Sequence, residues 1–267
     1  MYSLDDLRTL MRCLRDPEHG CPWDLKQTYQ TIAPHTLEEC YELIDAIESG
    51  DTEQIRQELG DVLFQVVFYS QLAEEAGDFT FSEVTDAIVS KLLRRHPHVF
   101  PEGELDKPTN GRAIDEAEIK RRWEEIKAEE RAAKAQNGVL DDIPTALPAL
   151  KRAQKLQKRA ATIGFDWQAV GGVFDKLDEE RAELAEAIAS GDKDHQAEEM
   201  GDLIFVVVNL ARHLGLDAET VLRAANRKFE ARFQQMEQLS DKSLGELSPA
   251  TLESLWEQAK KALKNAD

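Results

Sequence analysis

The chain has 267 residues and a formal net charge of −19 at pH 7, because 52 acidic side chains outnumber 33 lysines and arginines. This balance argues against non-specific nucleic-acid binding, which depends on basic patches, so we expect no stable nucleic-acid partner. No apolar run approaches the roughly 18 residues of a membrane span, and the charged, amphipathic start is not typical of a signal peptide. The three cysteines are typical of reduced thiols, so we expect a cytoplasmic protein without a membrane partner.

Residues 36–67 predict two helices joined by a tight turn. Thr36 and Glu39 form the pattern of a capping box, which predicts a helix that begins near Leu37 and ends near Gly50. Asp51 is expected to cap the next helix. Apolar residues recur there at helical spacing, at Leu59, Val62, Leu63, Val66 and Val67.

The rest of the chain also favours helices. Amphipathic patterns predict helices at about 81–95 and 217–238, and strand signals are weak throughout. Residues 96–111 are rich in proline and glycine and predict a loop, and the pair Gly171-Gly172 predicts a turn. We therefore predict an all-α fold of two tandem helical bundles, at 1–105 and 151–267. Residues 106–150 are expected to form a connector of loop and charged helix.

The chain contains a duplication. Residues 38–67 align without a gap to residues 179–208, at an offset of 141, and 15 of the 30 positions are identical. The likeness continues at an offset of 137, where Lys91 and Arg95 stand opposite Lys228 and Arg232. Self-similarity of this kind predicts two copies of one structural unit.

Acidic residues recur on the inner faces of the predicted hairpins. Residues three apart share one face of a helix, so Glu180 lies with Glu183, and Glu199 with Asp202. The turn brings the two pairs together, and four such carboxylates repel one another unless a cation intervenes. Mg²⁺ prefers oxygen ligands of this kind, and Mn²⁺ is the expected substitute. The first copy repeats the set at Glu39, Glu42, Glu58 and Asp61.

Other interpretations of the acidic residues fit less well. A single ExxD motif is usually an exposed pair of helix acids, but here the pattern spans a turn and occurs twice. Di-iron bundles take histidine ligands from Glu-x-x-His motifs, and none of the six histidines has a glutamate three residues before it. The glycine-rich phosphate loops GxxxxGKS and GxGxxG are also absent from the sequence.

The motif EExxE followed by ExxD resembles that of the all-α nucleoside triphosphate pyrophosphohydrolases. Almost the whole chain is similar to the MazG family, in the segments GCPWDLKQT, EECYE, ELGD, RRHPHVF, LPALKRAQKLQKRA and GFDW. This resemblance implies a Mg²⁺-dependent hydrolase with tandem helical domains that forms a homodimer. The implied reaction cuts ribo- or deoxyribonucleoside triphosphates to the monophosphate and pyrophosphate, by attack of water on the α-phosphorus.

The resemblance also implies roles for individual residues. The magnesium ligands would be Glu180, Glu183, Glu199 and Asp202. The adjacent Glu179 would orient water or support the ligands, and Lys228 and Arg232 would hold phosphate oxygens.

The nucleoside end of the site is expected nearby. Asn209 follows Asp202 by seven residues, so it lies near the acidic face, and with Asn226 it is a candidate contact for sugar or base. Phe165 and Trp167 are candidate stacking residues. His195 stands where the family often has a lysine, and would bind phosphate only when protonated.

The two copies differ in these polar positions. Phe68 stands opposite Asn209, and Val89 stands opposite Asn226. We therefore predict that the second copy carries most of the catalysis. Surplus apolar residues at Val62, Phe64, Val66 and Phe68 also predict dimerisation through helix packing. The runner-up function is a metal-stabilised helical adaptor, or a regulator that binds nucleotide without turnover.

Overall fold

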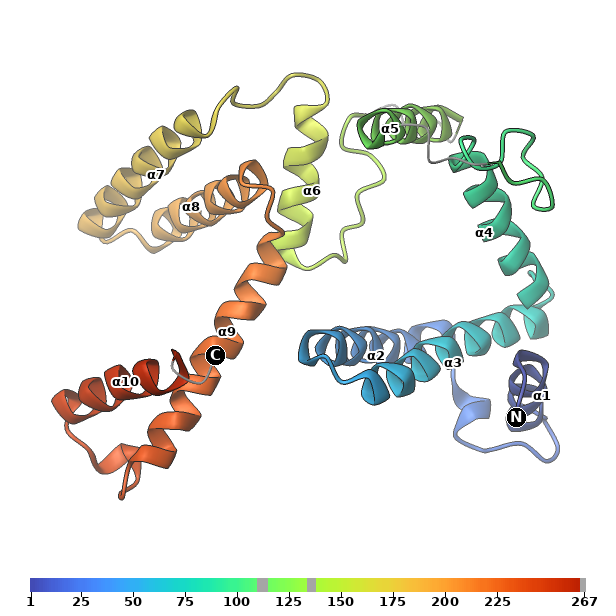
Figure 1. Cartoon of the computed structure of the whole chain (residues 1–267), viewed down its shortest axis with the longest axis horizontal. Coiled ribbons are helices and arrows are strands. Elements are labelled where there is room, and N and C mark those ends of the chain that lie inside the picture. The colour runs from blue at the N-terminus through green and yellow to red at the C-terminus, as the bar shows by residue number, and fades with distance from the viewer. Residues whose placement is uncertain (110–114, 134–137, 265–267) are drawn as a thin grey trace. The chain divides into compact units, whose positions relative to one another are not determined.

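The computed structural model describes residues 1–109, 115–133 and 138–264, and all regular structure in these ranges is helical. The predicted all-α fold is confirmed (Figure 1). The chain divides into two compact units, Met1–Lys127 and Ala128–Asp267, at a point inside the charged helix that was expected to be a connector. None of the helices in the described ranges has both the length and the apolar character needed to cross a membrane.

The first unit is built around a helical hairpin. Its elements are α1 (Leu4–Leu14), the 3-10 turn η1 (Asp24–Lys26), α2 (Tyr29–Ser49), α3 (Thr52–Ala76), α4 (Phe81–Arg95) and the start of α5 (Glu116–Ala133). α2 and α3 pack against each other as an antiparallel pair, and α1 packs on α3 (Figure 1). Between them lies the core of the unit, formed by Met11, Ile32, Val67, Phe68 and Leu72.

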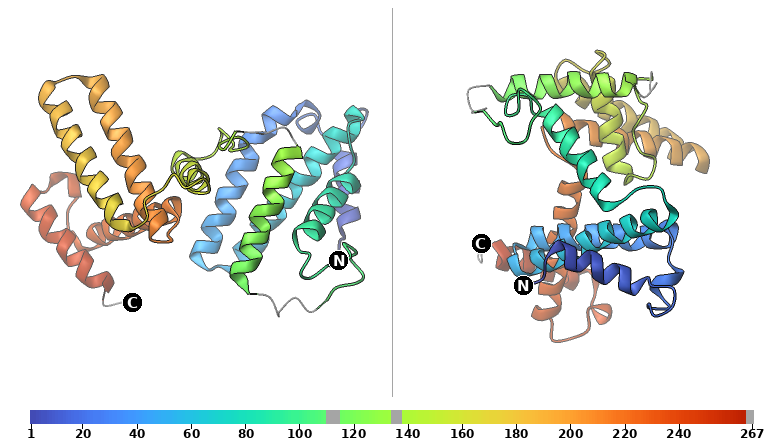
Figure 2. Two further views of the ribbon diagram at one scale, coloured as in Figure 1. Left: turned by 90° about the horizontal axis from the view of Figure 1, so that it is seen from above. Right: turned by 90° about the vertical axis from the view of Figure 1, so that its right-hand side faces the viewer.

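The second unit repeats this hairpin and adds another. Its elements are α6 (Ala149–Ala161), α7 (Val170–Ser190), α8 (Lys193–His213), α9 (Ala218–Leu239), the 3-10 turn η3 (Leu244–Glu246) and α10 (Pro249–Lys264). α7 and α8 lie side by side (Figure 2), and α6 packs on α8 as α1 packs on α3. α9 and α10 form the second hairpin, around a core of Met236, Leu255 and Ala259.

The two copies of the Ser-Gly-Asp turn have the predicted geometry. Gly50 and Gly191 adopt the left-handed conformation, with φ of 78° and 77°, which a residue with a Cβ reaches only at a cost. The next residue then caps the second helix of each hairpin: Asp51 Oδ1 accepts from Gln54 N at 3.1 Å, and Asp192 Oδ1 accepts from His195 N at 3.2 Å. The turn therefore sets the same register in both hairpins.

The predicted start of α2 is wrong. The helix begins at Tyr29 and is capped by Thr28, so Thr36 lies inside it. The Thr36 hydroxyl accepts no helix-start amide; it contacts the hydroxyl of Tyr69 on α3 at 2.8 Å. A threonine followed three residues later by glutamate also occurs inside helices, and here the true capping pair is Thr28 and Thr31.

The duplication extends further than the sequence comparison indicated. At an offset of 133, Trp123, Glu124 and Lys127 of α5 align with Trp256, Glu257 and Lys260 of α10. Each helix closes the same ion pair, at 3.0 Å in α5 and 2.7 Å in α10. Each tryptophan ring also lies near another aromatic ring: its centroid is 5.3 Å from that of His96, just after the end of α4, or 5.4 Å from that of Phe229 in α9. In these residues the helix that we expect to be part of a connector is similar to α10.

The turn geometry predicts opposite effects for two Gly→Ala changes in the first unit. Gly50→Ala places a Cβ in the left-handed region and should lower the free energy of unfolding by about 1–2 kcal/mol. Gly60→Ala, inside α3 with no atom within 4 Å of the new Cβ, should raise it by about 0.5–1 kcal/mol. Denaturant unfolding of both variants measures the difference, and effects of the same sign would contradict this account of the turn.

Candidate functional site

Three acidic side chains converge where α7 packs on α8. Glu180 of α7 and Glu199 and Asp202 of α8 each place one carboxylate oxygen within 4.8 Å of the others. Glu180 is only 4% exposed, and Glu199 is partly buried. The ExxD spacing and the antiparallel hairpin produce this convergence, since residues three apart share a face.

Glu183 lies next to this group without joining it. The group of three does not include its carboxylate. Its pKa is raised, mainly by burial and further by the nearby charges of Glu180 and Glu199, while Lys176 acts in the opposite direction. The structure thus brings together three of the four expected ligands and places the fourth within their electrostatic field.

Lys176 supplies positive charge to the acidic residues, and the sequence analysis missed it. Its Nζ lies 2.8 Å from Glu179 Oε1 and 2.7 Å from Glu180 Oε1. These two hydrogen bonds raise the pKa of Lys176, so the side chain stays charged. The spacing of four residues before Glu180 was the available signal, because such residues are neighbours on a helix.

The three carboxylates could hold a divalent metal ion, and their spacing can be compared with the coordination of Mg²⁺. Mg²⁺ takes oxygen ligands at about 2.0–2.1 Å in an octahedron, which keeps opposite oxygens roughly 4 Å apart. Oxygens of Glu180, Glu199 and Asp202 within 4.8 Å of one another approach that span. Water and substrate oxygens usually complete such a site, so three or four carboxylates are enough.

The first copy forms an equivalent acidic group. Glu39, Glu58 and Asp61 bring their oxygens within the same 4.8 Å. Burial raises the pKa of Glu39 and of Glu58, and neighbouring carboxylates, including Glu42, raise both further. His35 stands in the position of Lys176, so the partly buried Glu39 has no permanently charged side chain at this position of its helix.

His195 lies at the edge of the acidic group. Its Nε2 is 3.0 Å from Glu199 Oε1, one helical turn further along α8. The structure therefore pairs this predicted phosphate contact with an acidic residue of the cluster. Glu179, more exposed than Glu180, contacts Lys176 and not the three converging carboxylates.

A network of buried and partly buried polar side chains lies at the C-terminal end of α8. Asn209 is 4% exposed, and its Oδ1 accepts a hydrogen bond from Arg212 Nε at 2.8 Å. Arg212 Nη2 also pairs with Asp166, and His213 Nε2 lies 2.9 Å from the same carboxylate oxygen. The hydrogen bond from Arg212 holds the pKa of Asp166 below its ordinary value despite partial burial, and His213 adds to the effect. The ionised Asp166 carboxylate therefore stabilises the fold at pH values above the ordinary pKa of an aspartate. This stabilisation is lost as the pH falls through the lowered pKa of Asp166 in the folded protein.

The two predicted stacking residues flank Asp166 and differ in exposure. Phe165 is 79% exposed, whereas Trp167 is 40% exposed and packs over Gly172, where a Cβ would lie 2.4 Å from the indole Cδ1. Gly172 is part of α7, so the predicted turn at Gly171-Gly172 is wrong. Its missing side chain makes room for the tryptophan.

A basic groove lies between α9 and α10. It has a volume of about 850 Å³ and contains the predicted phosphate contacts Lys228 and Arg232. The sequence analysis missed the other basic residues that line it, Arg227, Lys260, Lys261 and Lys264. Asn226, the remaining predicted contact, is exposed on α9 beside Arg227. In an otherwise acidic chain, this groove concentrates positive charge.

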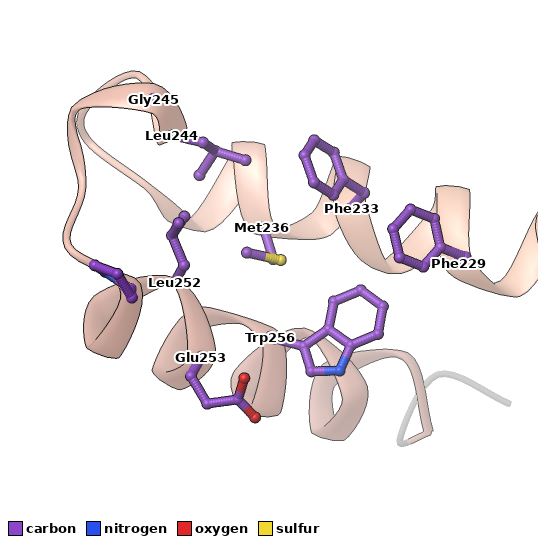
Figure 3. Close-up of a pocket in the computed structure, with 9 residues that line it drawn as sticks. Phe229, Phe233, Met236, Leu244, Gly245, Leu252, Glu253 and Trp256 are labelled. Atoms are coloured by element: carbon purple, nitrogen blue, oxygen red, sulfur yellow. The ribbon is translucent and has the colours of Figure 1, made fainter. Parts of the chain in front are cut away.

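An apolar pocket adjoins the groove on the same two helices (Figure 3). Its volume is about 570 Å³, and Trp256, Phe229 and Phe233 supply its aromatic lining. The Arg232 guanidinium of the groove lies over the Trp256 ring of the pocket, 5.6 Å from its centroid, so this contact joins the groove to the pocket. The match between Trp123 and Trp256 at an offset of 133 was the sequence signal for this pocket.

The sequence of this chain is similar to those of several known proteins. The family model of the MazG nucleotide pyrophosphohydrolase domain matches residues 27–100 and 171–236, once in each copy. The chain is 50% identical over 268 residues to a nucleoside triphosphate pyrophosphohydrolase of Escherichia coli, with 98% of each protein covered. It is 44% identical to the nucleoside triphosphate pyrophosphohydrolase/pyrophosphatase MazG of Thermotoga maritima, covering 96% of this chain and 95% of that protein. It is also 39% identical to the Bacillus subtilis protein YabN, of which it covers 52%.

The ion pair between Lys176 and Glu180 predicts that a bound metal ion can replace the lysine as the positive charge that stabilises the buried carboxylate. Lys176→Met leaves a buried carboxylate without its cation and should lower the free energy of unfolding by about 1–3 kcal/mol without Mg²⁺. Added Mg²⁺ should then raise the melting temperature more in this variant than in the wild type. Lys193→Met, which removes an ammonium bonded to Gln196, is the matched control. Equal Mg²⁺-dependent shifts in all three proteins would contradict the prediction.

Proposed function

The chain belongs to the MazG nucleotide pyrophosphohydrolase family, and we propose that it hydrolyses nucleoside triphosphates to the monophosphate and pyrophosphate with Mg²⁺ as cofactor. The observation that carries this proposal is the convergence of Glu180, Glu199 and Asp202, with Glu183 beside them. Mn²⁺ has similar ligand preferences and should replace Mg²⁺. The free thiols of Cys13, Cys21 and Cys40 agree with a cytoplasmic location, where this substrate is found.

Each group of residues has a distinct part in the proposed reaction. A bound Mg²⁺ ion would supply charge neutralisation and a water of lowered pKa. Glu180, Glu199 and Asp202, with Glu183, hold the cation, and Glu179 takes part by sharing Lys176 with Glu180. Lys228 and Arg232 bind phosphate oxygens and offset the charge that develops on the leaving pyrophosphate.

The nucleoside is bound by the remaining polar and aromatic groups of the second copy. Asn209 and Asn226 provide amides for hydrogen bonds to sugar or base, and Phe165 and Trp167 provide exposed rings for stacking. We extend this proposal to Trp256, whose ring already lies under the Arg232 guanidinium.

We assign most of the catalysis to the C-terminal copy, from residue 151 onwards. The buried acid is paired with Lys176 in the second copy, whereas the first copy has His35 there. Phe68 replaces Asn209 and is fully buried in the core of the first unit, so it leaves no polar group at that place. The first copy keeps the geometry for binding a cation, which supports a structural or regulatory role for its acidic group.

The assignment to the second copy predicts unequal effects of two matched changes. Glu199→Gln removes a carboxylate from the second acidic group and should reduce pyrophosphate release on the order of a hundredfold or more. Glu58→Gln makes the same change in the first group and should leave most of the activity. A panel of ribo- and deoxyribonucleoside triphosphates with Mg²⁺, assayed separately for pyrophosphate and orthophosphate, measures both effects. Orthophosphate as the sole product would overturn the proposed reaction, and a larger loss in Glu58→Gln would overturn the assignment.

We also propose that the chain forms a homodimer through the hairpins. Of the side chains expected to drive dimerisation, Phe68 is buried in the core and Phe64 packs against it, so they are not available, whereas Val66 is exposed. Each hairpin exposes four apolar side chains at matching positions, Ile47, Leu59, Leu63 and Val66 in the first and Ile188, Met200, Ile204 and Val207 in the second. These side chains are between 39% and 60% exposed. On α8 the 3.6-residue period places them on a different face from the acids. Two hairpins that cover such faces form a four-helix bundle, and the repetition of the face in both copies indicates that the fold uses it.

The homodimer predicts a mass of about twice 30.1 kDa in light scattering coupled to gel filtration. Ile204→Glu places a charge on the apolar face of α8 and should shift the mass toward that of one chain. Ile163→Glu, at an isoleucine that is also exposed but lies between α6 and α7, is the matched control and should stay dimeric. A wild-type mass near that of one chain would dismiss the dimer.

A further inference from the structure

Arg212 and Asn209 form a hydrogen bond whose direction is fixed by chemistry. A guanidinium has only donors, so the atom of Asn209 that meets Arg212 Nε at 2.8 Å must be the carbonyl oxygen Oδ1. The amide nitrogen Nδ2 therefore faces away from Arg212 and carries two N–H donors. Among the described residues, none accepts a hydrogen bond from this nitrogen.

The network behind Arg212 holds the guanidinium in place. Arg212 pairs with Asp166, which also receives the backbone N–H of Trp167 at 2.9 Å and contacts His213 Nε2 at 2.9 Å. Arg212 is 15% exposed and Asp166 is 22% exposed. A partly buried, multiply bonded arginine has little freedom to release Asn209, so the orientation of the amide is set before any ligand arrives.

Asn209 lies on the same stripe of α8 as the acidic residues. It follows Asp202 by seven residues, which is almost two full turns and about 10 Å along the helix axis. The acids bind the phosphate end of the substrate in the proposed function. A group displaced by this length along the same face meets the nucleoside end.

The first copy has an apolar side chain at the position that corresponds to Asn209. Phe68 replaces the asparagine, and the Arg15 guanidinium lies over its ring, 5.5 Å from the centroid. Arg15 is itself paired with Glu75, at 2.7 Å. An ion-paired arginine therefore contacts this position of the hairpin in both copies, but only in the second copy does it hold an amide.

We propose that Arg212 is a positioning residue that presents Asn209 to the substrate as a hydrogen-bond donor. The site would then select nucleoside triphosphates with an acceptor at this point, such as a sugar oxygen, a base carbonyl or an unprotonated ring nitrogen. This inference rests on the proposed function. It adds that Asn209 acts as the hydrogen-bond donor to the substrate and that Arg212 fixes the orientation of its amide.

Asn209→Asp is the direct test, because it keeps the acceptor for Arg212 and removes both donors. KM for the preferred nucleoside triphosphate should rise tenfold or more, with a smaller change in kcat, because the lost contact binds ground state and transition state alike. Inorganic tripolyphosphate, which has the phosphates without the nucleoside, should inhibit the wild type and the variant equally. Melting temperatures show whether the variant is folded.

Arg212→Lys tests the positioning role separately. Lysine keeps a cation for Asp166 but loses the planar fork that also reaches Asn209, so KM should rise here too. Arg159→Lys changes another half-buried arginine with an ion pair, to Asp142, and is the matched control with unchanged KM. This variant also tests the inference if Asn209→Asp does not fold.

Three results would overturn the inference. The first two are a wild-type KM in Asn209→Asp and a wild-type KM in folded Arg212→Lys. The third is a weakening of tripolyphosphate inhibition in Asn209→Asp by the same factor as the rise in KM. The last result would place Asn209 at the phosphate end. Failure of the proposed function looks different, because the wild type itself would then release no pyrophosphate. In that case calorimetry can test the inference by measuring the binding of the four common nucleoside triphosphates and of tripolyphosphate. The nucleoside triphosphates should bind more weakly to Asn209→Asp than to the wild type, and tripolyphosphate should bind equally to both.

Discussion

The structure depends on one electrostatic constraint: carboxylates that converge at the packed face of a hairpin require a positive charge among them. Glu180 is almost fully buried, and an isolated ionised carboxylate in such a place is costly. Lys176 meets this requirement from the same helix, within hydrogen-bond distance. A divalent cation meets it better, because it can contact all three carboxylates at once. The hairpin register, set by the left-handed glycine and the aspartate cap, exists in the same form wherever the acids occur.

The two copies answer this constraint with different surroundings. Both retain the acidic group, yet the second copy surrounds it with a charged lysine and a buried amide, and the first with a histidine and a buried phenylalanine. Both copies therefore keep an acidic group that could hold a cation, whereas the asparagine at position 209 has no counterpart in the first copy. In the second copy the hydrogen bond from Arg212 offsets part of the cost of burying Asn209, since a buried polar group is costly unless it is bonded.

Much of this architecture was accessible from the sequence because helix periodicity and turn chemistry are local. Gly50 and Asp51, with their repeats at Gly191 and Asp192, identified the turn, and the ExxD spacing predicted the convergence on α8. The start of α2 was misplaced because Thr36 matches a capping box by letters alone, while its hydroxyl is used across the hairpin by Tyr69. The pairing of Arg212 with Asp166 could not be predicted, since these residues are 46 positions apart and only the fold joins them.

The basic groove shows why comparison of the copies is informative beyond the motif. The offset between the copies is 141 in the hairpins, 137 in α4 and α9, and 133 in α5 and α10. It changes first within the pair α3 and α8, because α3 has 25 residues and α8 has 21, and again in the connections that precede α5 and α10. Within α5 and α10 the pairs Trp123–Trp256 and Lys127–Lys260 survive this drift, and in α10 they line the pocket and the groove. Trp256 and Lys260 therefore keep their counterparts in the first copy although the offset changes, which supports the proposal that α10 contributes to the site.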